Sequence, residues 1–512
     1  MKRLLYLSLV LLTAWTACKK DDHVKPDPVD RGNGELTAQD EDSLKFYVWW
    51  DMLSDSENVP FYYWNDQVPA VDPKDSRYDS AEDLLDDIAS YPEVNGEKVD
   101  RYSFLDRVGS VSDELDGGQG GDMGFMVAGA QTPDNQTVLV VLYVYAGSPA
   151  GKAGVQRGWE VTAINGADID LSSDAGYDAV NSALFSDASA TFTFVPSSGT
   201  SKNVKLSRAS YHINPVLEDT VYTVAGKKVG YFVYNSFINV LGSEGNAAVA
   251  KEEISNAFAK FKSDGVRDLI VDLRYNGGGA VPSAEYLDNL IAPSAVNGEN
   301  MYSYKYNKEL TAAFNSDAEY KKEYIDPVKF SLASGNLNLD RVFFIVSSNT
   351  ASASELTINN LKPYMDVYLV GDQTFGKPVG FFTTPIWFVK EGDTEPSEVA
   401  DLYDINFETV NAQEKGGYYS GMTPDNKLVD YVGYNWGDTE DPRLESIFSF
   451  ISGKGFIDQD TFDSGARKQA FGRQAARPAM LRRSPGSRML GKPGFNGMVD
   501  YRFRDKKPSF RR

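Results

Sequence analysis

Helical and extended segments alternate through the second half of the chain, as the spacing of apolar residues shows. Within residues 246–264 the apolar positions Ile254, Ala257, Phe258 and Phe261 fall three or four residues apart, which predicts an amphipathic helix. Continuous apolar runs predict buried strands, and helices are expected between them; the strands cover 228–234, 268–274, 342–346 and 366–370, and the helices 282–291 and 351–361. Repeated βα units imply a largely parallel sheet, so we expect residues 211–457 to form one α/β domain.

Two regions with different patterns precede this domain. Residues 41–112 are rich in aromatic residues and contain helical stretches near 42–54 and 80–90, so a small helical domain is favoured over an aromatic ligand platform. Residues 113–210 contain clustered glycines, a β-rich run at 138–145 and a short capped helix near 148–155. A strand then ends in the tight turn Asn165-Gly166, whose residue types favour a β-hairpin.

The N-terminus has the pattern of an export signal. Lys2 and Arg3 precede an apolar run from Leu4 to Leu12, which is too short to cross a bilayer, and Cys18 follows small residues. Residues 1–18 resemble a lipoprotein signal peptide, with Cys18 as the lipidated residue; an ordinary cleaved signal is the alternative. Residues 19–40 are polar and predict a tether. We therefore expect an exported protein anchored in the bacterial cell envelope, at the outer membrane, where residues 19–22 resemble a signal for surface exposure.

Charge is distributed unevenly along the chain. The formal net charge is −22, which disfavours nucleic acid and anionic membrane as partners of the body, so the membrane is expected to be reached only through Cys18. Residues 466–512 carry fourteen Lys and Arg against two Asp. This Gly- and Pro-containing tail, residues 458–512, is predicted to be a solvated, disordered extension; docking on the acidic body is the alternative. Cys18 is the sole cysteine, which excludes an intrachain disulfide.

Three polar segments follow predicted strands, at 276–279, 350–355 and 374–377. Sites in open α/β sheets lie at the carboxyl ends of strands, so these segments are candidates for chemistry. The chain has two histidines, His23 in the tether and His212 before the α/β domain, which disfavours a Ser-His-Asp triad. A lysine whose pKa is lowered by burial can act as the base instead.

Ser352 is predicted to lie at a strand-to-helix turn, where backbone N–H groups are free to bind an anion. The amide of Ala353 is then a natural donor to an oxyanion, and Gly278 or Gly279 can supply a second one. Ser352 at a helix start can also be an ordinary helix cap, and Lys377 an ordinary solvated lysine, when each is considered alone.

The three segments together resemble a known family. DLRYNGGG (272–279), TASASE (350–355) and QTFGKP (373–378) are similar to the signature segments of the C-terminal processing, or tail-specific, serine peptidases. The resemblance implies Ser352 as nucleophile, Lys377 as general base, and Gly279 and Ala353 as the oxyanion hole. It also implies a crotonase-like β-spiral, polypeptide substrates and no cofactor. Many members carry a glutamine where this chain has Phe381.

A second resemblance lies ahead of the peptidase motifs. The segments SPAGKAG (148–154) and GWEVTAING (158–166) are similar to a bacterial PDZ domain, in which a bound peptide adds a strand to the sheet. This implies that Met123, Gly124, Phe125 and Met126 form the peptide-binding loop, although the same residues fit the start of an ordinary strand. The expected fold is thus a multi-domain α/β (α+β) protein with a PDZ-like domain before the peptidase domain; the oligomeric state stays open.

Three alternatives remain to be weighed against this hypothesis. Gly371 to Lys377 has the G-x-x-x-x-G-K spacing of a phosphate-binding loop, but Pro378 stands where a magnesium-binding Ser or Thr is needed. Asp458, Asp460 and Asp463 might suggest calcium, yet the spacing favours a solvated acidic turn, and no metal is predicted. A catalytically weak or inactive PDZ-type peptide-binding lipoprotein is the third alternative, and Phe381 is the reason to keep it.

Overall fold

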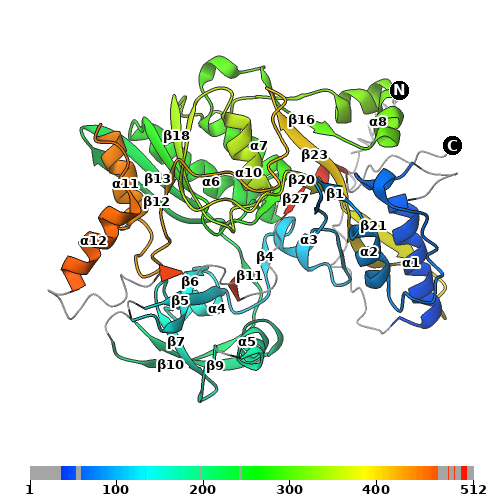
Figure 1. Cartoon of the computed structure of the whole chain (residues 1–512), viewed down its shortest axis with the longest axis horizontal. Coiled ribbons are helices and arrows are strands. Elements are labelled where there is room, and N and C mark those ends of the chain that lie inside the picture. The colour runs from blue at the N-terminus through cyan, green and yellow to red at the C-terminus, as the bar shows by residue number, and fades with distance from the viewer. Residues whose placement is uncertain are drawn as a thin grey trace, which may run out of the picture.

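The computed structural model describes residues 36–53, 59–132, 134–171, 173–196, 199–241, 245–470, 482–483, 489–490 and 497–503. Cys18, the signal peptide at 1–18 and most of the tether at 19–40 lie outside the described residues. Figure 1 shows three parts: an N-terminal region at the right, a module that projects at the bottom, and a larger α/β body that contains the predicted peptidase motifs.

A six-stranded sheet forms the centre of the body, in the order β12-β13-β14-β18-β19-β24. Its strands are β12 (Val216–Val224), β13 (Lys227–Tyr234), β14 (Asp268–Asp272), β18 (Arg341–Val346), β19 (Asp366–Gly371) and β24 (Asn426–Lys427). All strands from β13 onward run parallel, with Val271 opposite Phe344 and Phe344 opposite Leu369. The predicted βα units and parallel sheet are confirmed.

Helices cover both faces of this sheet (Figure 1). One face carries α6 (Gly245–Ser263), α7 (Val281–Ile291) and α10 (Ala353–Leu361), and the other carries α11 (Pro442–Ile451). The four apolar residues that predicted α6 are all buried in the core between that helix and the sheet. Within this domain, the predicted boundaries of the helices and strands agree with the observed ones to within two residues.

A second six-stranded sheet stands beside the first, in the order β15-β27-β20-β23-β16-β17. Its strands are β15 (Gly278–Ala280), β27 (Gly497–Val499), β20 (Val379–Phe381), β23 (Ile405–Asn411), β16 (Asn300–Lys305) and β17 (Val328–Lys329). α8 (Lys308–Asn315) and α9 (Ala318–Tyr320) lie between β16 and β17 in the chain. Strands from the middle and the end of the chain therefore lie side by side.

The N-terminal region does not form the separate helical domain that the sequence predicts for 41–112. Its helices and strands are α1 (Ala38–Leu53), α2 (Ala81–Ala89), α3 (Ser110–Leu115), β1 (Glu93–Val94), β2 (Glu97–Lys98) and β3 (Phe104–Asp106). β3 pairs with β22 (Ser397–Tyr403), which pairs with β21 (Thr384–Phe388). The apolar side chains of α1 and α2 share one core with these later strands, because neither helix could bury its apolar face alone. The aromatic residues Phe61, Tyr62 and Trp64 are buried in packing.

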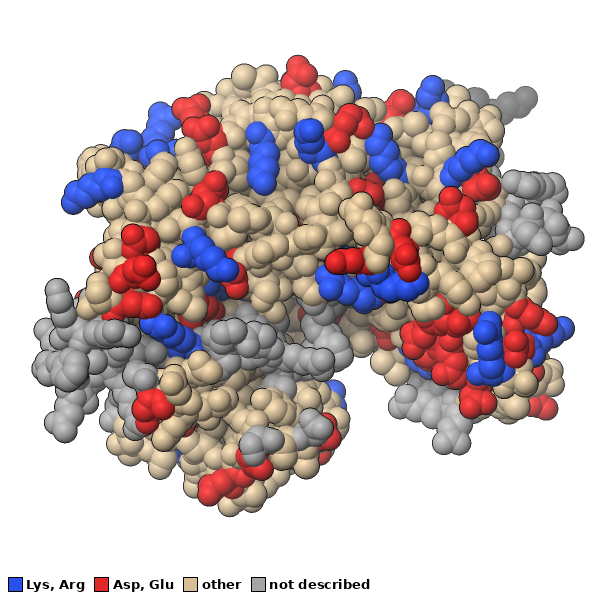
Figure 2. Space-filling view, viewed as in Figure 1, with Lys and Arg blue, Asp and Glu red and all other residues tan. Residues whose placement is uncertain are grey.

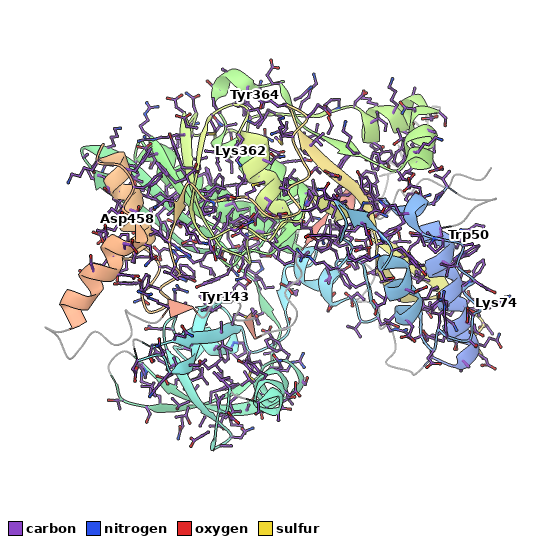
Figure 3. All side chains as sticks on the ribbon, in the orientation of Figure 1. Trp50, Lys74, Tyr143, Lys362, Tyr364 and Asp458 are labelled. Carbon is purple, nitrogen blue, oxygen red and sulfur yellow. The ribbon has the colours of Figure 1, made fainter. Side chains whose placement is uncertain are left out.

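Residues 121–210 form the projecting part, here called the inserted module. A short pairing of β4 (Gln119–Gly120) with β11 (Tyr211–His212) closes its neck. Its elements are β5 (Phe125–Gln131), β6 (Thr137–Val144), α4 (Pro149–Lys152), β7 (Glu160–Ile164), β8 (Ala167–Asp168), α5 (Asp174–Asn181), β9 (Ser189–Val195) and β10 (Lys202–Ser207). Asn165 and Gly166 have φ of 52° and 82°, so the tight turn predicted between β7 and β8 is confirmed. Tyr143 marks the junction of the module with the body (Figure 3).

The prediction of a disordered tail over 458–512 is wrong for the described residues. α12 (Gln459–Ala470) is helical, β25 (Arg482–Arg483) and β26 (Met489–Leu490) pair with β5, and β27 lies inside the second sheet. Phe503 stacks on Phe382 with 3.7 Å between ring centroids. This part of the tail is ordered because Met498, Val499, Tyr501 and Phe503 bury their apolar side chains. The composition of all 55 residues, which is basic and rich in Gly and Pro, does not reveal this short apolar segment.

Acidic and basic side chains are interspersed over the face seen in Figure 2, and acidic residues gather over the N-terminal region. α2 contributes Glu82, Asp83, Asp86 and Asp87 to that region. No helix among the described residues has the length and apolar character needed to cross a membrane.

Replacing Phe503 tests whether the end of the chain belongs to the core. Phe503→Ala should lower the free energy of unfolding by about 3–5 kcal/mol, because it removes a buried ring and leaves a cavity. Phe46→Ala is the control, since that ring is 40% exposed and its loss should cost within about 0.5 kcal/mol. Urea unfolding followed by fluorescence measures both; equal midpoints for Phe503→Ala and the parent would contradict the burial of the tail.

Candidate active site

The three predicted polar segments meet at the carboxyl ends of adjacent parallel strands. The 273–277 loop follows β14, the 347–352 loop follows β18, and the 372–378 loop follows β19. Backbone hydrogen bonds join them: the amide of Ala351 donates to the carbonyl of Asn276 at 3.1 Å, and that of Phe375 to Thr350 at 2.9 Å. The loops therefore form one rigid unit, as the position of strand ends in an α/β sheet favours.

Ser352 occupies a strained turn at the start of α10. Its φ of 57° and ψ of −106° lie in a region that side chains rarely adopt. Such a conformation costs about 1–3 kcal/mol and persists only where surrounding contacts enforce it. The Oγ atom is buried and has no hydrogen-bond partner among the described residues. Ser352 is therefore a buried hydroxyl at a strained helix start, with Glu355 at the capping-box position.

Glu355 holds the serine turn and the lysine loop together. Its Oε2 accepts hydrogen bonds from the backbone amides of Ser352 at 2.9 Å and Lys377 at 2.8 Å. Its Oε1 accepts from the amide of Gly376 at 2.8 Å and from the hydroxyl of Thr374 at 2.5 Å. Burial raises the pKa of Glu355, while these four hydrogen bonds oppose that rise.

Lys377 lies in an aromatic cage contributed by distant parts of the chain. Its Nζ is 3.9 Å from the ring centroid of Phe381 and 4.6 Å from that of Tyr102, which comes from the N-terminal region. Tyr102 also donates its hydroxyl to the carbonyl of Gly376 at 3.0 Å. Burial lowers the pKa of Lys377 well below its ordinary value, and the charges of Asp100 and Glu355 oppose this shift only in part.

The glycines of the 273–277 loop and β15 lie beside the start of α10. Gly278 and Gly279 have φ of 107° and 136°, which favour glycine. A Cβ on Gly278 would lie 3.1 Å from the amide nitrogen of Ala353, so the two predicted oxyanion donors are neighbours. The amide of Gly278 itself donates to Oδ1 of Asn276 at 2.9 Å, and Gly279 pairs with Met498 of β27.

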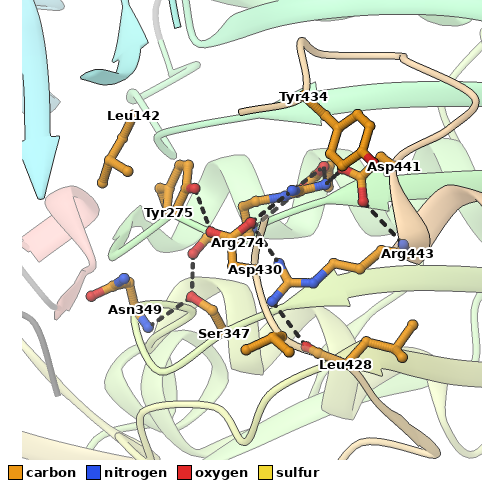
Figure 4. Close-up of polar contacts among 12 residues, drawn as sticks. Leu142, Arg274, Tyr275, Ser347, Asn349, Leu428, Asp430, Tyr434, Asp441 and Arg443 are labelled. Atoms are coloured by element: carbon orange, nitrogen blue, oxygen red, sulfur yellow. Dashed lines mark hydrogen bonds and ion pairs between the residues drawn. The ribbon is translucent and has the colours of Figure 1, made fainter. Parts of the chain in front are cut away.

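A buried network of charges supports the loop after β14 (Figure 4). Arg274 donates to Asp272 at 2.7 Å and to Asp430 and Asp441 at 3.0 Å each. Burial opposes the charge on Asp430, but the surrounding arginines hold its pKa below the ordinary value. Arg157 of the inserted module donates to the hydroxyl of Tyr275 at 3.0 Å. The module therefore contacts the same loop that carries the glycines.

The structure changes the interpretation of the predicted peptide-binding loop. Met123 and Phe125 are buried in the core of the inserted module, so their side chains cannot form a binding surface. Gly124 has φ of 81°, and its carbonyl accepts the amide of Tyr145 at 2.9 Å. Met126 alone of the four lines a cavity of about 190 Å³ at the junction with the neck. The strand interpretation holds for Phe125 and Met126, which begin β5.

The other candidate sites do not have the required surroundings. A phosphate-binding loop leads into a helix, whereas residues 372–378 lead into β20 and give the amides of Gly376 and Lys377 to Glu355. His212 lies 3.3 Å from Glu253 of α6. Asp458 accepts from Thr461, and Asp463 contacts Tyr431. No group of three or more metal-binding side chains occurs within the described ranges.

Sequence reasoning gave no role to Glu355 or Tyr102. Glu355 has a local signal, because Ser followed three residues later by Glu is a capping-box pattern, and it lies inside the quoted segment TASASE. Tyr102 has no such signal, since 275 residues separate it from Lys377 and only the fold brings them together.

Comparison with known proteins agrees with this geometry. Residues 228–427 match Peptidase family S41. The Probable CtpA-like serine protease of Staphylococcus aureus (strain bovine RF122 / ET3-1) is 27% identical over 256 residues, which is 50% of this chain and 45% of that protein. Carboxyl-terminal-processing peptidase 3 of Arabidopsis thaliana chloroplasts is 27% identical over 249 residues, which is 47% of this chain and 42% of that protein. The chain thus spans less than half the length of these curated relatives.

A solved structure shares the fold. The crystal structure of an S41 protease from Bacteroides fragilis NCTC 9343 superimposes with a TM-score of 0.58 at 23% identity, covering 80% of this chain and 97% of that one. The fold is thus the multi-domain α/β arrangement with mixed sheets seen in such proteases. The comparisons thus relate residues 228–427 to Peptidase family S41, a family of serine peptidases. Over about half of its length the chain is similar to proteins named CtpA-like serine protease and carboxyl-terminal-processing peptidase.

The burial of Lys377 predicts a measurable cost in stability. Lys377→Met should raise the free energy of unfolding at pH 7 by about 1–4 kcal/mol, because it removes a cation from an apolar site. The unfolded lysine is protonated up to about pH 10.4, whereas the buried amine resists protonation, so the parent gains stability as pH rises. The advantage of Lys377→Met should therefore shrink between pH 7 and about pH 11.

Urea unfolding at several pH values measures this difference. Lys74→Met is the matched control, because Lys74 is exposed on the N-terminal region (Figure 3) and its replacement should give no pH-dependent difference. A constant difference between Lys377→Met and the parent across the pH range would contradict the lowered pKa.

Proposed function

We propose that this chain is a serine endopeptidase of the C-terminal processing type, with Ser352 as nucleophile and Lys377 as general base. One observation carries the proposal: a single oxygen of the buried Glu355 binds the backbone amides of both Ser352 and Lys377. Both side chains are also buried, with Ser352 unexposed and Lys377 only 1% exposed. A base whose pKa is lowered is what serine activation without histidine requires.

The proposed reaction uses these groups in two steps. The neutral amine of Lys377 takes the proton of the Ser352 hydroxyl while Oγ attacks the substrate carbonyl carbon. The amides of Ala353 and Gly279 hold the oxyanion, and the protonated Lys377 then gives its proton to the leaving amine. Water hydrolyses the acyl-enzyme by the same proton path, which frees Ser352.

Phe381 stands where many C-terminal processing peptidases have a glutamine that positions the lysine. We infer that the rings of Phe381 and Tyr102 take over this role by packing against the Lys377 amine, whose Nζ lies 3.9 Å and 4.6 Å from their centroids. The hydroxyl of Tyr102 fixes the loop by its bond to Gly376. The aromatic cage supports an active enzyme over the alternative of an inactive peptide-binding lipoprotein.

The substrate and location are also proposals. An unstructured polypeptide, bound near its C-terminal end, fits a serine site beside a module built on a β-sheet, which an extended polypeptide can join as a further strand. The inserted module is proposed to be PDZ-like on its SPAGKAG and GWEVTAING segments, and the body to be a crotonase-like β-spiral. Lipidation at Cys18 and residence in the bacterial envelope rest on the N-terminal sequence.

Two substitutions test the nucleophile and the base. Ser352→Ala and Lys377→Ala should each lower cleavage of unfolded casein at least about 10³-fold, while near-native circular dichroism is kept. Lys362→Ala is the control, because Lys362 is an exposed lysine at the end of α10, and this variant should cleave like the parent (Figure 3). Mass spectrometry of peptide products gives the readout. Cleavage by Lys377→Ala at neutral pH would mean that another group is the base.

The cage predicts a change in the pH profile. Tyr102→Ala should admit water to Lys377 and raise its pKa, so half-maximal kcat/KM should move to higher pH, with about a 10–100-fold loss at pH 7. Tyr102→Phe keeps the ring and should stay close to the parent. A profile for Tyr102→Ala that keeps the parent's midpoint would show that the ring does not position the base.

A further inference from the structure

The tail occupies the outer edge of the inserted module. Arg482 lies opposite Gln131 and Arg483 opposite Ala130; Met489 lies opposite Ala128 and Leu490 opposite Val127. Both pairings are antiparallel. As the paired tail positions rise from 482 to 490, their partners on β5 fall from 131 to 127. The two short strands therefore lie along the same edge of β5. Without them, β5 would be the last strand of the sheet.

An edge strand presents unpaired backbone groups, and peptide-binding sheets capture an extended polypeptide at such an edge. β26 also contacts α5, so it lies between a helix and the edge of the sheet. This is the arrangement in which a strand-adding ligand is held on two sides. The chain's own residues 489–490 fill the place that such a ligand would need.

Arg482 extends the same segment to the body. Its backbone forms a bridge with Tyr431, and its guanidinium pairs with Asp463 and lies 5.3 Å from the ring centroid of Tyr431. Arg482 thus has Gln131 of the module on one side and Tyr431 of the body on the other. Tyr431 follows Asp430, the carboxylate that binds Arg274 below the loop after β14. The segment fastens the module to the part of the body that supports the site.

The chain then continues into the site's own sheet. Gly497 donates its amide to the carbonyl of Gly277 at 3.0 Å, and Gly497 and Met498 pair in parallel with Gly278 and Gly279. Because β27 is buried, it anchors the tail firmly, whereas β25 and β26 lie on an outer edge.

We propose that the two tail strands, β25 (Arg482–Arg483) and β26 (Met489–Leu490), are an intramolecular ligand of the inserted module. They fill the β5 edge that an extended polypeptide would otherwise join, and they clamp the module to the body. An incoming polypeptide binds by displacing them. This inference rests on the proposed peptide-binding role of the module, and it identifies the competitor for that role as a segment of the same chain.

A reversible lock tests the proposal. Ala128→Cys and Met489→Cys place cysteines at directly opposed positions, where antiparallel Cα atoms lie about 4.5–5.5 Å apart, within the range of a disulfide. The lock variants are produced without residues 1–18, so they contain no other cysteine. Adding Ser352→Ala separates binding from catalysis. The probe is a fluorescein-labelled peptide with the sequence of residues 482–490, and fluorescence anisotropy measures its binding.

The reduced lock variant should bind the peptide at least about 10-fold more tightly than the oxidised one, because only the reduced segment can leave the edge. Glu93→Cys/Lys98→Cys is the matched control, since it forms an equivalent antiparallel pair in the N-terminal region and should bind equally in both states. Equal binding by the oxidised and reduced lock variants would overturn the proposal.

Hydrogen exchange gives a readout that needs no ligand. Met489→Pro/Leu490→Pro removes two backbone donors, so amides in residues 127–131 should exchange at least about 10-fold faster than in the parent. Unchanged exchange there would also overturn the proposal. In the chain that retains Ser352, the oxidised lock should cleave casein more slowly than the reduced one. If no form cleaves casein, the proposed peptidase function fails, while the binding and exchange results still decide whether the segment is a ligand.

Discussion

The buried carboxylate of Glu355 is the contact on which the geometry of the site depends. Its two oxygens accept four hydrogen bonds, from the amides of Ser352, Gly376 and Lys377 and from the hydroxyl of Thr374. Hydrogen bonds to a charged group contribute about 1.5–3 kcal/mol each, enough to offset a strained residue. Ser352 has an unfavourable φ, and no direct bond joins its loop to the loop of Lys377. The carboxylate of Glu355 therefore fixes the strained turn and the relative position of the two loops at once.

The site combines groups that are costly to bury with contacts that enforce their burial. Lys377 loses hydration in exchange for two aromatic faces, and the serine hydroxyl has no polar partner among the described residues. Below them, Arg274 pairs with three aspartates in a fully buried network. Arg157 and Arg443 add further positive charge around Asp430. This network supports the loop next to the strained turn at Ser352.

Distant parts of the chain complete the central α/β body. The N-terminal region supplies Tyr102 over Lys377, the inserted module supplies Arg157 to the loop after β14, and the tail supplies β27 beside Gly278 and Gly279. Each of these contacts reaches a different edge of the same site. A change in any of the three regions can therefore alter the geometry around Ser352 without touching it, which gives the surroundings of the site a means of controlling it.

The sequence by itself determined the features that depend on neighbouring residues. Periodicity fixed α6 and the parallel strands, and the order of the three polar segments placed Gly279, Ser352 and Lys377 at successive strand ends, because strand ends meet at one edge of a parallel sheet. The tertiary structure alone decided that Tyr102 covers Lys377, that Met123 and Phe125 serve a core, and that the basic tail enters two sheets. The first and the last of these depend on pairings between residues hundreds of positions apart, and the second on the packing of the whole inserted module. Three residues such as Gly497–Val499 carry no local pattern that identifies their partner strand.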